Sequence, residues 1–373
     1  MTQTTSGSPA HDRPADRARS RGTTGSSPSA SGRRVSALDI ARGVAILGML
    51  FAHAAPIGPD SALPLKALAA AAQVTAPMFV MLAGLSLGLM TGGGSPAVDG
   101  RWSLRWQILR RGLVLIALGL ALWRIDSGIA VVIDYIGVVI VLLVPVLFAP
   151  RWLLAALAAA ALVASPLLRA WAEREGLIVQ VAGDPVLGKL ASWLVLGPHY
   201  WAALFLFFAL AGLIIARSDV RAARTPRRLI LAGVAAGAVG VAVALTTSYS
   251  PHPGSTEPSG NLVALGCAVG LVGVLLFLEG RTGARGVLRA LAPLEWAGRM
   301  PLTIYTLQIV LFGIVRGATG SISSWLLLFG AILLSLVFAW AWTRWVSRQG
   351  PLEAAVAWVS GRPVSLGRTE RSA

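Results

Sequence analysis

The chain has 373 residues, of which 55% are hydrophobic and 13% charged, and its mean hydropathy is +0.72. Soluble domains carry about 25% charged residues, so this composition excludes an ordinary water-soluble enzyme and a disordered chain. The net charge of +16 comes from arginines that flank apolar runs, which makes them topology signals and argues against a nucleic-acid partner. Cys267 is the only cysteine, so there is no disulfide framework and no cysteine metal site, and we expect no bound metal.

In chain order, the sequence divides into a polar tail, a hydrophobic body and a second tail. Residues 1–36 are rich in Ser, Thr, Gly, Pro and Arg, which predicts a disordered cytoplasmic segment. A helix needs roughly 20 apolar residues to cross a bilayer, and the body, residues 37–346, predicts ten spans. They cover 37–57, 65–90, 106–123, 129–149, 152–169, 199–216, 229–247, 262–279, 301–317 and 323–346. Residues 347–373 form the C-terminal cytoplasmic tail, and residues 171–198 form the longest loop, with room for a short interfacial helix.

The distribution of basic residues predicts the orientation of this bundle. With the N-terminus inside, 25 of the 32 Lys and Arg residues lie on the cytoplasmic side, 6 lie on the outer side and Arg42 lies within the first span. That asymmetry follows the positive-inside rule. We therefore expect an all-α polytopic bundle of about ten transmembrane helices in the plasma membrane, with both termini cytoplasmic. Small residues at four-residue spacing predict close helix packing: Gly84/Gly88, Gly233/Gly237 and Gly266/Gly270.

The first span carries on one face three polar residues whose transfer into the membrane costs free energy. Asp39 and Arg42 are three residues apart and can pair, and His53 follows Arg42 after eleven residues, close to three helical turns. The stripe would place Asp39 and Arg42 near the cytoplasmic end and His53 about 16 Å further out. Charged groups within a span are functional candidates by default. Asp39 and Arg42 alone are equally consistent with an ion pair that holds helices together, whereas the whole stripe favours function.

Other polar residues are secondary candidates. Asp134 lies near the outer end of the fourth span, His199 opens the sixth, and His252 lies in the loop after the seventh. The three histidines His53, His199 and His252 could converge on the outer side, although a loop histidine is usually only solvated. Gln308 lies mid-membrane, where the favoured interpretation is an interhelical hydrogen bond. On the inner side, residues 92–94 form a Gly-Gly-Gly loop, and the arginines behind it could receive an anionic ligand or anionic lipid: Arg101, Arg105, Arg110 and Arg111.

Several segments resemble a superfamily of multi-pass membrane acyltransferases. Residues 34–45, RVSALDIARGVA, resemble its opening "R…LDxxRGxA", and Arg42 and His53 fit the R-x10-H pattern of acyltransferase family three. Residues 76–84, APMFVMLAG, look like the second-helix "PxFxxxxG" segment. Residues 298–308, GRMPLTIYTLQ, and residues 350–353, GPLE, are similar to the late motif and tail of the domain-of-unknown-function 418 family. The likeness to this family and to the heparan-alpha-glucosaminide N-acetyltransferase family covers residues 34 to 355.

The resemblance implies transfer of an acyl group, usually acetyl, from cytoplasmic acyl-CoA to a hydroxyl or amine on the far side of the membrane. The acceptor would be a glycan or lipid-linked sugar of the cell envelope. The likeness implies that Arg42, with Arg105, Arg110 and Arg111, meets the CoA phosphates, and that His53 serves as a general base, with Asp39 beside Arg42. The acyl-CoA would be a donor substrate and not a permanently bound cofactor.

Two other classes of function remain open from the sequence. In a transporter or flippase, Asp39, Arg42 and His53 would form a path for protons or substrate. In a non-catalytic membrane protein, the same fold would serve as a scaffold. The sequence also leaves the oligomeric state open, a homodimer included.

Overall fold

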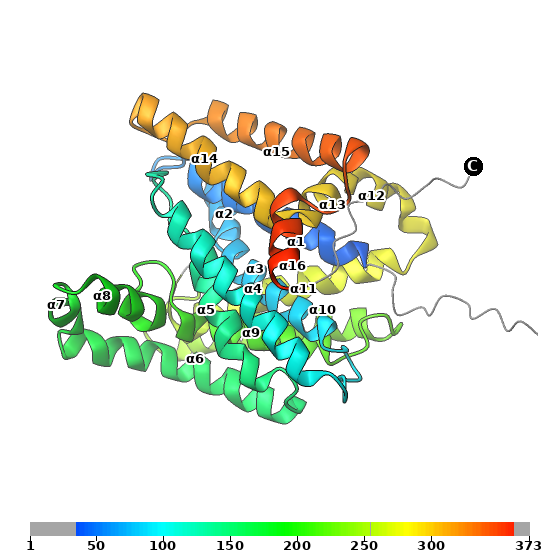
Figure 1. Cartoon of the computed structure of the whole chain (residues 1–373), viewed down its shortest axis with the longest axis horizontal. Helices are drawn as coiled ribbons and strands as arrows, with labels where there is room; N and C mark the ends of the chain where they lie inside the picture. The colour runs from blue at the N-terminus through cyan, green and yellow to red at the C-terminus, as the bar shows by residue number, and fades with distance from the viewer. Residues whose placement is uncertain (1–34, 254, 362–373) are drawn as a thin grey trace, which may run out of the picture. The chain divides into compact units, whose positions relative to one another are not determined.

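The computed structural model describes residues 35–253 and 255–361, and all regular structure in this part of the chain is helical (Figure 1). The long helices are α1 (Ser36–Ala54), α3 (Thr75–Met90), α4 (Arg101–Leu122), α6 (Arg151–Arg174), α9 (Ala202–Ala216), α10 (Thr225–Thr246), α11 (Pro258–Glu279), α14 (Pro301–Thr319) and α15 (Trp325–Trp345). The shorter helices are α2 (Leu63–Ala72), α5 (Ile133–Leu143), α7 (Leu177–Val181), α8 (Pro185–Ala191), α12 (Arg285–Ala290), α13 (Ala292–Arg299) and α16 (Pro351–Val359). The described helices belong to one compact unit that begins at Ser36.

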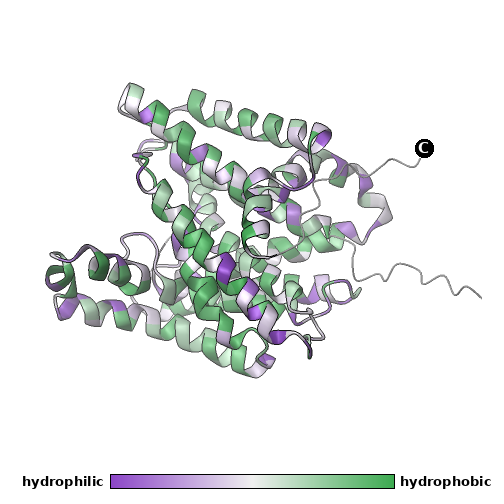
Figure 2. Ribbon diagram, in the orientation of Figure 1, coloured by the Kyte–Doolittle hydropathy of each residue, from purple (hydrophilic) through white to green (hydrophobic). Residues whose placement is uncertain are grey.

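Within the described part of the chain, seven helices are long and apolar enough to cross a membrane. They cover Ser36–Ala54, Leu63–Met90, Arg151–Arg174, Thr225–Thr246, Pro258–Glu279, Pro301–Thr319 and Trp325–Trp345. Figure 2 shows apolar residues along the lengths of the helices and hydrophilic residues gathered mainly at their ends and in the connections. The predicted class, a polytopic helical membrane bundle, is confirmed.

Each of the ten predicted spans corresponds to a helix. Three of these helices, α4, α5 and α9, are not among the seven that are long and apolar enough to cross a membrane. Helix α4 begins at Arg101, five residues before the predicted start, and therefore carries four arginines in its first three turns. Helices α5 and α9 are short, with 11 and 15 residues. The predicted number of ten spans, the orientation and the two cytoplasmic tails stay predictions, and residues 1–34 and 362–373 of those tails lie outside the described part.

Glycine contacts hold the bundle together at close range. A Cβ on Gly84 of α3 would overlap the backbone of Ala209 in α9. Gly233 of α10 and Gly266 of α11 likewise approach each other's backbones, with 2.6 Å from the added Cβ of either residue to the carbonyl oxygen of the other. Small residues permit such approach, and the dispersion contacts they allow drive association where lipid removes the hydrophobic force between helices. The predicted packing role of these glycines is confirmed.

The connection between α11 and α14 is more structured than the sequence suggested. Residues 281–299, expected as a basic inner segment, contain a 3-10 turn (Thr282–Ala284), α12 and α13. Helix α13 packs along α1, and the contact needs glycine on both sides: a Cβ on Gly43 would overlap the carbonyl of Leu294, and one on Gly298 would overlap that of Asp39. The N-terminal half of α1 is therefore enclosed.

Residues 171–198 form a structured outer segment and not a loop with one short helix. Helix α6 continues to Arg174, and α7, α8 and the π-helical turn η3 (Ser192–Leu196) follow. Asp184 caps α8, because its carboxylate accepts the backbone N–H groups of Val186 and Leu187 at 2.8 and 3.0 Å.

Helix α5 ends in a 3-10 turn, Val144–Val146, which contains Pro145.

Candidate functional site

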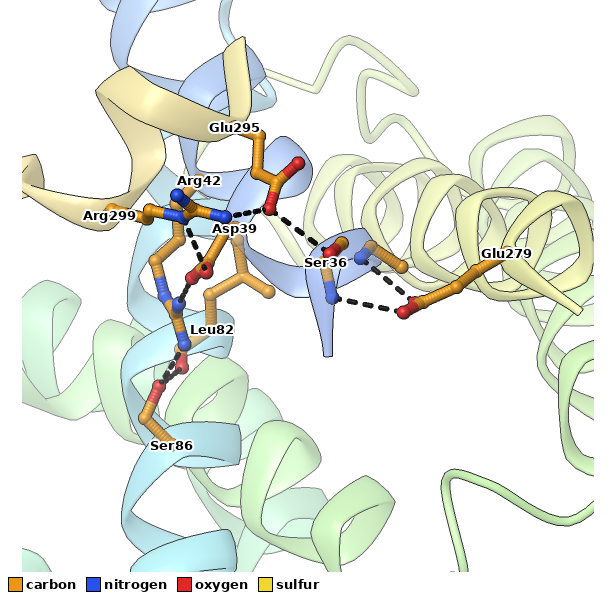
Figure 3. A network of polar contacts seen from close by, with 9 residues as sticks. Ser36, Asp39, Arg42, Leu82, Ser86, Glu279, Glu295 and Arg299 are labelled. Atoms are coloured by element: carbon orange, nitrogen blue, oxygen red, sulfur yellow. Dashed lines mark hydrogen bonds and ion pairs between the residues drawn. The ribbon is translucent and has the colours of Figure 1, made fainter. Parts of the chain in front are cut away.

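The first polar cluster surrounds the start of α1, at its predicted cytoplasmic end (Figure 3). Glu279, the last residue of α11, accepts the backbone N–H groups of Ser36 and Ala37 at 3.1 and 3.0 Å. These donors have no partner within the helix, so a carboxylate there both satisfies them and complements the helix dipole. The hydroxyl of Ser36 donates to Glu295 of α13 at 3.1 Å. Two other helices therefore fix the position of α1.

Asp39 and Arg42 form the ion pair that their spacing predicted. Asp39 is 1% exposed, and its Oδ1 pairs with Nη1 of Arg42. Arg42 also donates to the hydroxyl of Ser86 in α3 at 2.9 Å. On the opposite side of Asp39, Arg299 approaches Oδ2 at 3.9 Å and pairs with Glu295. Arg42 is therefore held by α1 and α3 within a network of four ionised side chains, as Figure 3 shows.

Helix α1 runs without a break from this cluster to His53. The eleven residues from Arg42 to His53 separate the two side chains by about 16 Å along the axis and leave them on nearly the same face. His53 lies half-buried in the last turn of α1 and interacts electrostatically with His199, which precedes α9. The structure therefore brings two of the three predicted histidines together.

The second polar cluster, which we call the outer cluster, continues from these histidines. It consists of His53, Asp134, Tyr135, His199, Tyr200 and Tyr305. The ring of Tyr200 lies 6.3 Å from His199 and 6.2 Å from Tyr135. Tyr305 of α14 interacts electrostatically with Tyr200 and with Asp134. Side chains from α1, α5, α14 and the segment before α9 thus form one continuous group.

The outer cluster lies below the outer ends of the longer helices. Tyr305 is the fifth residue of α14, yet its hydroxyl accepts the N–H of Val132 at 3.0 Å and donates to the carbonyl of Ala130 at 3.3 Å. A Cβ added to Gly313, two turns further along α14, would lie 4.0 Å from Cα of Ser127. The chain therefore descends along α14 from Ser127 to Val132 before α5 begins. Trp201, just before α9, donates to Ser165 in the middle of α6 at 2.7 Å. Both short helices begin within the depth of the bundle.

Asp134 is bound more tightly than its sequence position indicated. It is fully buried, and its Oδ2 pairs with Lys189 of α8 at 2.9 Å and accepts the indole N–H of Trp193 at 2.8 Å. The ammonium group of Lys189 also lies over the ring of Trp123, 3.9 Å from its centroid. Oδ1 of Asp134 is buried and has no hydrogen-bond partner.

The predicted basic group on the inner side divides among separate partners. Arg105 donates to the carbonyl of Pro145 at 3.2 Å and lies over the ring of Phe148, and Arg111 donates to Sδ of Met90. Arg110 lines a cavity of about 400 Å³ between α4 and the end of α16, together with Ser103, Trp106, Gln107, Ser360 and Gly361. Among these predicted arginines of α4, Arg110 therefore has the geometry of a ligand contact.

The Gly-Gly-Gly loop is bound from within the protein. Arg217, at the end of α9, is 4% exposed; it donates to the carbonyl of Gly93 at 2.9 Å and to the hydroxyl of Thr91 at 3.2 Å, and it also binds the carbonyl of Leu147. Burial, with a smaller contribution from Arg151, lowers the pKa of Arg217 from its ordinary value. The guanidinium therefore fixes this turn against the end of α5, which gives the loop a structural role.

The last two predicted residues are His252 and Gln308. The backbone of His252 bonds to Ser250 and Ser255 within the α10–α11 loop. Gln308 is 3% exposed on α14, and its Nε2 has no hydrogen-bond partner. It shares the buried face of α14 with Tyr305 and Phe312, and Phe312 packs against Leu50 of α1.

A comparison with known families decides the class of protein. The model of acyltransferase family 3, described as an acyltransferase domain, matches residues 35–344. The chain belongs to this family. It is therefore an acyltransferase-type membrane protein, as the resemblance of residues 34–45 and the R-x10-H spacing indicated. No curated protein matches the chain, and the narrower likeness to the 418 and heparan-type families remains a resemblance.

Sequence reasoning missed several residues of both clusters. Glu279, Glu295 and Arg299 were not among the predicted site residues, and Lys189 was assigned to a loop. Apart from the Arg299–Glu295 pair on one helix, their partners Ser36, Ala37, Asp39 and Asp134 lie 55 to 260 residues away in the chain, so no local period could reveal them. The available signal was composition, since Lys189 is one of only two lysines among 32 basic residues.

Proposed function

We propose that the protein transfers an acyl group, acetyl in the simplest case, from cytoplasmic acyl-CoA to a hydroxyl or amine of an extracytoplasmic glycan or lipid-linked sugar. The observation that carries this proposal is the course of α1. One unbroken helix in a chain of the acyltransferase family joins the Asp39–Arg42 ion pair to His53 and its neighbour His199. A reaction between a donor from one side and an acceptor from the other needs polar groups at both ends of such a path.

The donor side is supported by cationic groups on the predicted cytoplasmic face. Arg110 offers the cavity between α4 and α16 a planar, always charged group that suits phosphate, and Trp106, beside it, offers a ring face for a base. Arg42 lies further along the route, where Asp39 and Ser86 fix its orientation. In this proposal Arg110 meets the nucleotide part of CoA, and Arg42 orients the arm that carries the thioester.

The chemistry requires a base for the acceptor, and His53 is suited to the task. A neutral imidazole accepts a proton on its unprotonated nitrogen and is the usual general base of proteins. His53 takes the proton of the acceptor hydroxyl or amine as its oxygen or nitrogen attacks the thioester carbonyl carbon. The carbon–sulfur bond then breaks, and His53 returns the proton to the departing CoA thiolate.

The experiment uses sealed membrane vesicles of opposite orientation that contain the protein, with acetyl-labelled acetyl-CoA added outside. In inside-out vesicles, where the cytoplasmic face is external, the label should reach covalently bound lumenal sugar together with an equal amount of free CoA. Right-side-out vesicles should stay unlabelled until they are opened. Equal labelling in both orientations, or uptake of label without a covalent product, contradicts the proposal, and the second result supports a transporter.

A further inference from the structure

Asp134 presents an unused hydrogen-bond acceptor in the interior of the bundle. It lies in the first turn of α5 and is 0% exposed. Lys189 and Trp193 both contact Oδ2, while Oδ1 is buried without a partner. A buried acceptor of a carboxylate is costly to leave unsatisfied, and native structures leave few such atoms without a reason. The proposed proton transfer at His53 does not itself use Asp134.

The position of Asp134 connects it to the proposed base. Tyr135, the next residue, stacks edge-on against Tyr200 at 6.2 Å, and Tyr200 lies 6.3 Å from His199. His199 interacts electrostatically with His53. Aromatic rings therefore line the way from Asp134 to the base. A few polar groups among aromatic side chains are the usual composition of a small-molecule site, and the apolar face of a sugar ring packs well on aromatic surfaces.

We propose that Asp134 anchors the acceptor: its Oδ1 accepts a hydrogen bond from a hydroxyl group of a sugar ring, while a second hydroxyl of the same ring lies at His53. This inference rests on the proposed function and adds the residue that selects a sugar. Lys189 forms an ion pair with this carboxylate at 2.9 Å, and a charged acceptor forms a stronger hydrogen bond than a neutral one. The neutral side-chain amide of an asparagine at this position would accept a weaker hydrogen bond than the carboxylate.

Helix α8 controls access to this carboxylate. Lys189 and Trp193 cover Asp134, and the hydroxyl groups of Tyr135 and Ser192 meet at 2.9 Å. All three contacts join the segment 185–196 to the first turn of α5. The outward side of this segment is apolar, with Val186 67% and Leu187 52% exposed, which suits a position in the membrane interface. Entry of the acceptor therefore involves displacement of this segment from α5.

The test compares Asp134→Asn with two other variants in purified protein reconstituted in nanodiscs. Asp134→Asn keeps the size of the side chain and can still accept from Trp193. Lys189→Met removes the same ion pair from the other side and leaves the carboxylate in place. Asp126→Asn makes the same chemical change at an exposed aspartate that faces Arg316 at 3.4 Å. The probe is methyl β-D-glucopyranoside, and its binding is followed by saturation-transfer NMR.

We expect wild-type protein to bind the probe and Asp134→Asn to lose about 10- to 100-fold in affinity, the usual effect of removing a charged hydrogen-bond partner. Lys189→Met should change affinity less, and Asp126→Asn should leave it unchanged. In transfer assays, Asp134→Asn should raise KM for the sugar and leave KM for acetyl-CoA unchanged. Equal losses in Asp134→Asn and Lys189→Met indicate a purely structural ion pair and overturn the inference.

The result also separates this inference from the proposed function. Binding that depends on Asp134 without any acyl transfer supports the anchor and contradicts the acyltransferase proposal. Transfer to the sugar with the same KM in wild type and Asp134→Asn supports the reaction and refutes the anchor. A wild-type protein that does not bind the probe at all also refutes it.

Discussion

Glu353 accepts a hydrogen bond from the hydroxyl of Thr303 at 2.6 Å, although 50 positions separate the two residues in the chain. The same carboxylate accepts the backbone N–H groups of Leu302 at 2.6 Å and Thr303 at 3.1 Å. These donors belong to the first turn of α14 and have no partner within it. Glu353 therefore caps α14 from the C-terminal segment, so the GRMPLT and GPLE segments are two halves of one contact.

The Glu353 cap predicts a pH dependence of stability. Burial raises the pKa of Glu353 above its ordinary value, while hydrogen bonds from Thr303 and Leu302 act in the opposite direction. Because the folded-state pKa lies above the unfolded one, this stabilisation is complete below the unfolded pKa and is lost as pH rises through the folded pKa. As the pH rises through the folded-state pKa, the melting temperature of wild type in detergent should therefore fall more than that of Glu353→Gln, whose side chain cannot ionise. A constant difference between the two from about pH 4 to 9 contradicts the assignment.

The contact between α1 and α13 predicts opposite effects for two glycine substitutions. An added Cβ at Gly298 would overlap the Asp39 carbonyl and lie 2.7 Å from the nitrogen of Gly43, whereas nothing lies within 4 Å of one at Gly286 in α12. Gly298→Ala should therefore lower the free energy of unfolding by about 1–3 kcal/mol. Gly286→Ala should raise it by about 0.4–1 kcal/mol, since it restricts the unfolded chain. Thermal unfolding in detergent measures both, and equal effects would exclude close packing at Gly298.

Removal of the proposed base should abolish most transfer. His53→Ala is expected to reduce the rate by a factor of about 100 to 10,000, the usual contribution of general-base catalysis, while CoA still binds. His53→Asn keeps much of the size and hydrogen bonding and should be equally inactive. His252→Ala is the matched control in the α10–α11 loop and should retain full activity. A fully active His53→Asn variant makes His53 structural and directs attention to His199.

Donor binding should depend on two arginines. Calorimetric titration of CoA should show weaker binding for Arg110→Gln and for Arg42→Ala, with Arg42→Lys intermediate, because a lysine keeps the charge but loses the planar pair of donors. Arg227→Gln removes the same charge from an exposed position at the start of α10 and should bind CoA as wild type does. If Arg110→Gln and Arg227→Gln behave alike, the cavity beside α16 is not the donor site.

The predicted orientation can be tested by cysteine labelling. In a Cys267→Ala background, Gln180→Cys in α7 should react with a membrane-impermeant maleimide from the outer side. Gly283→Cys, at an uncrowded position before α12, should react from the cytoplasmic side. Labelling of residue 180 from the cytoplasmic side alone would show that the orientation is opposite to the predicted one. Residue 180 is exposed, so access to the reagent does not limit the result.

The helical framework could be predicted from the sequence because span length and apolar content are local properties. Residues 281–299 show where that reasoning stops. The sequence identified them only as a basic connection between two predicted spans, yet α13 packs on α1 because Gly43 and Gly298 let two backbones approach. That complementarity exists only once the two segments are brought together in space.

The candidate site could be predicted where one helix carries it. The spacing of Asp39, Arg42 and His53 on α1 follows from 3.6 residues per turn, and the Asp39–Arg42 pair forms as expected. The partners of that stripe lie on other helices. Arg299 approaches Asp39 and His199 approaches His53 through tertiary contacts, which no spacing within a single span encodes.

The short length of α5 has an electrical consequence. From Asp134 at its start to Leu147, whose carbonyl binds Arg217, the chain covers 13 residues, or roughly 20 Å of helix, against about 30 Å for the hydrocarbon of a bilayer. Ionised groups thus stand at both ends of a thinner insulating layer inside the protein than in the lipid around it. A charged group that moves from one end of α5 to the other therefore crosses about 10 Å less of apolar surroundings than it would in lipid.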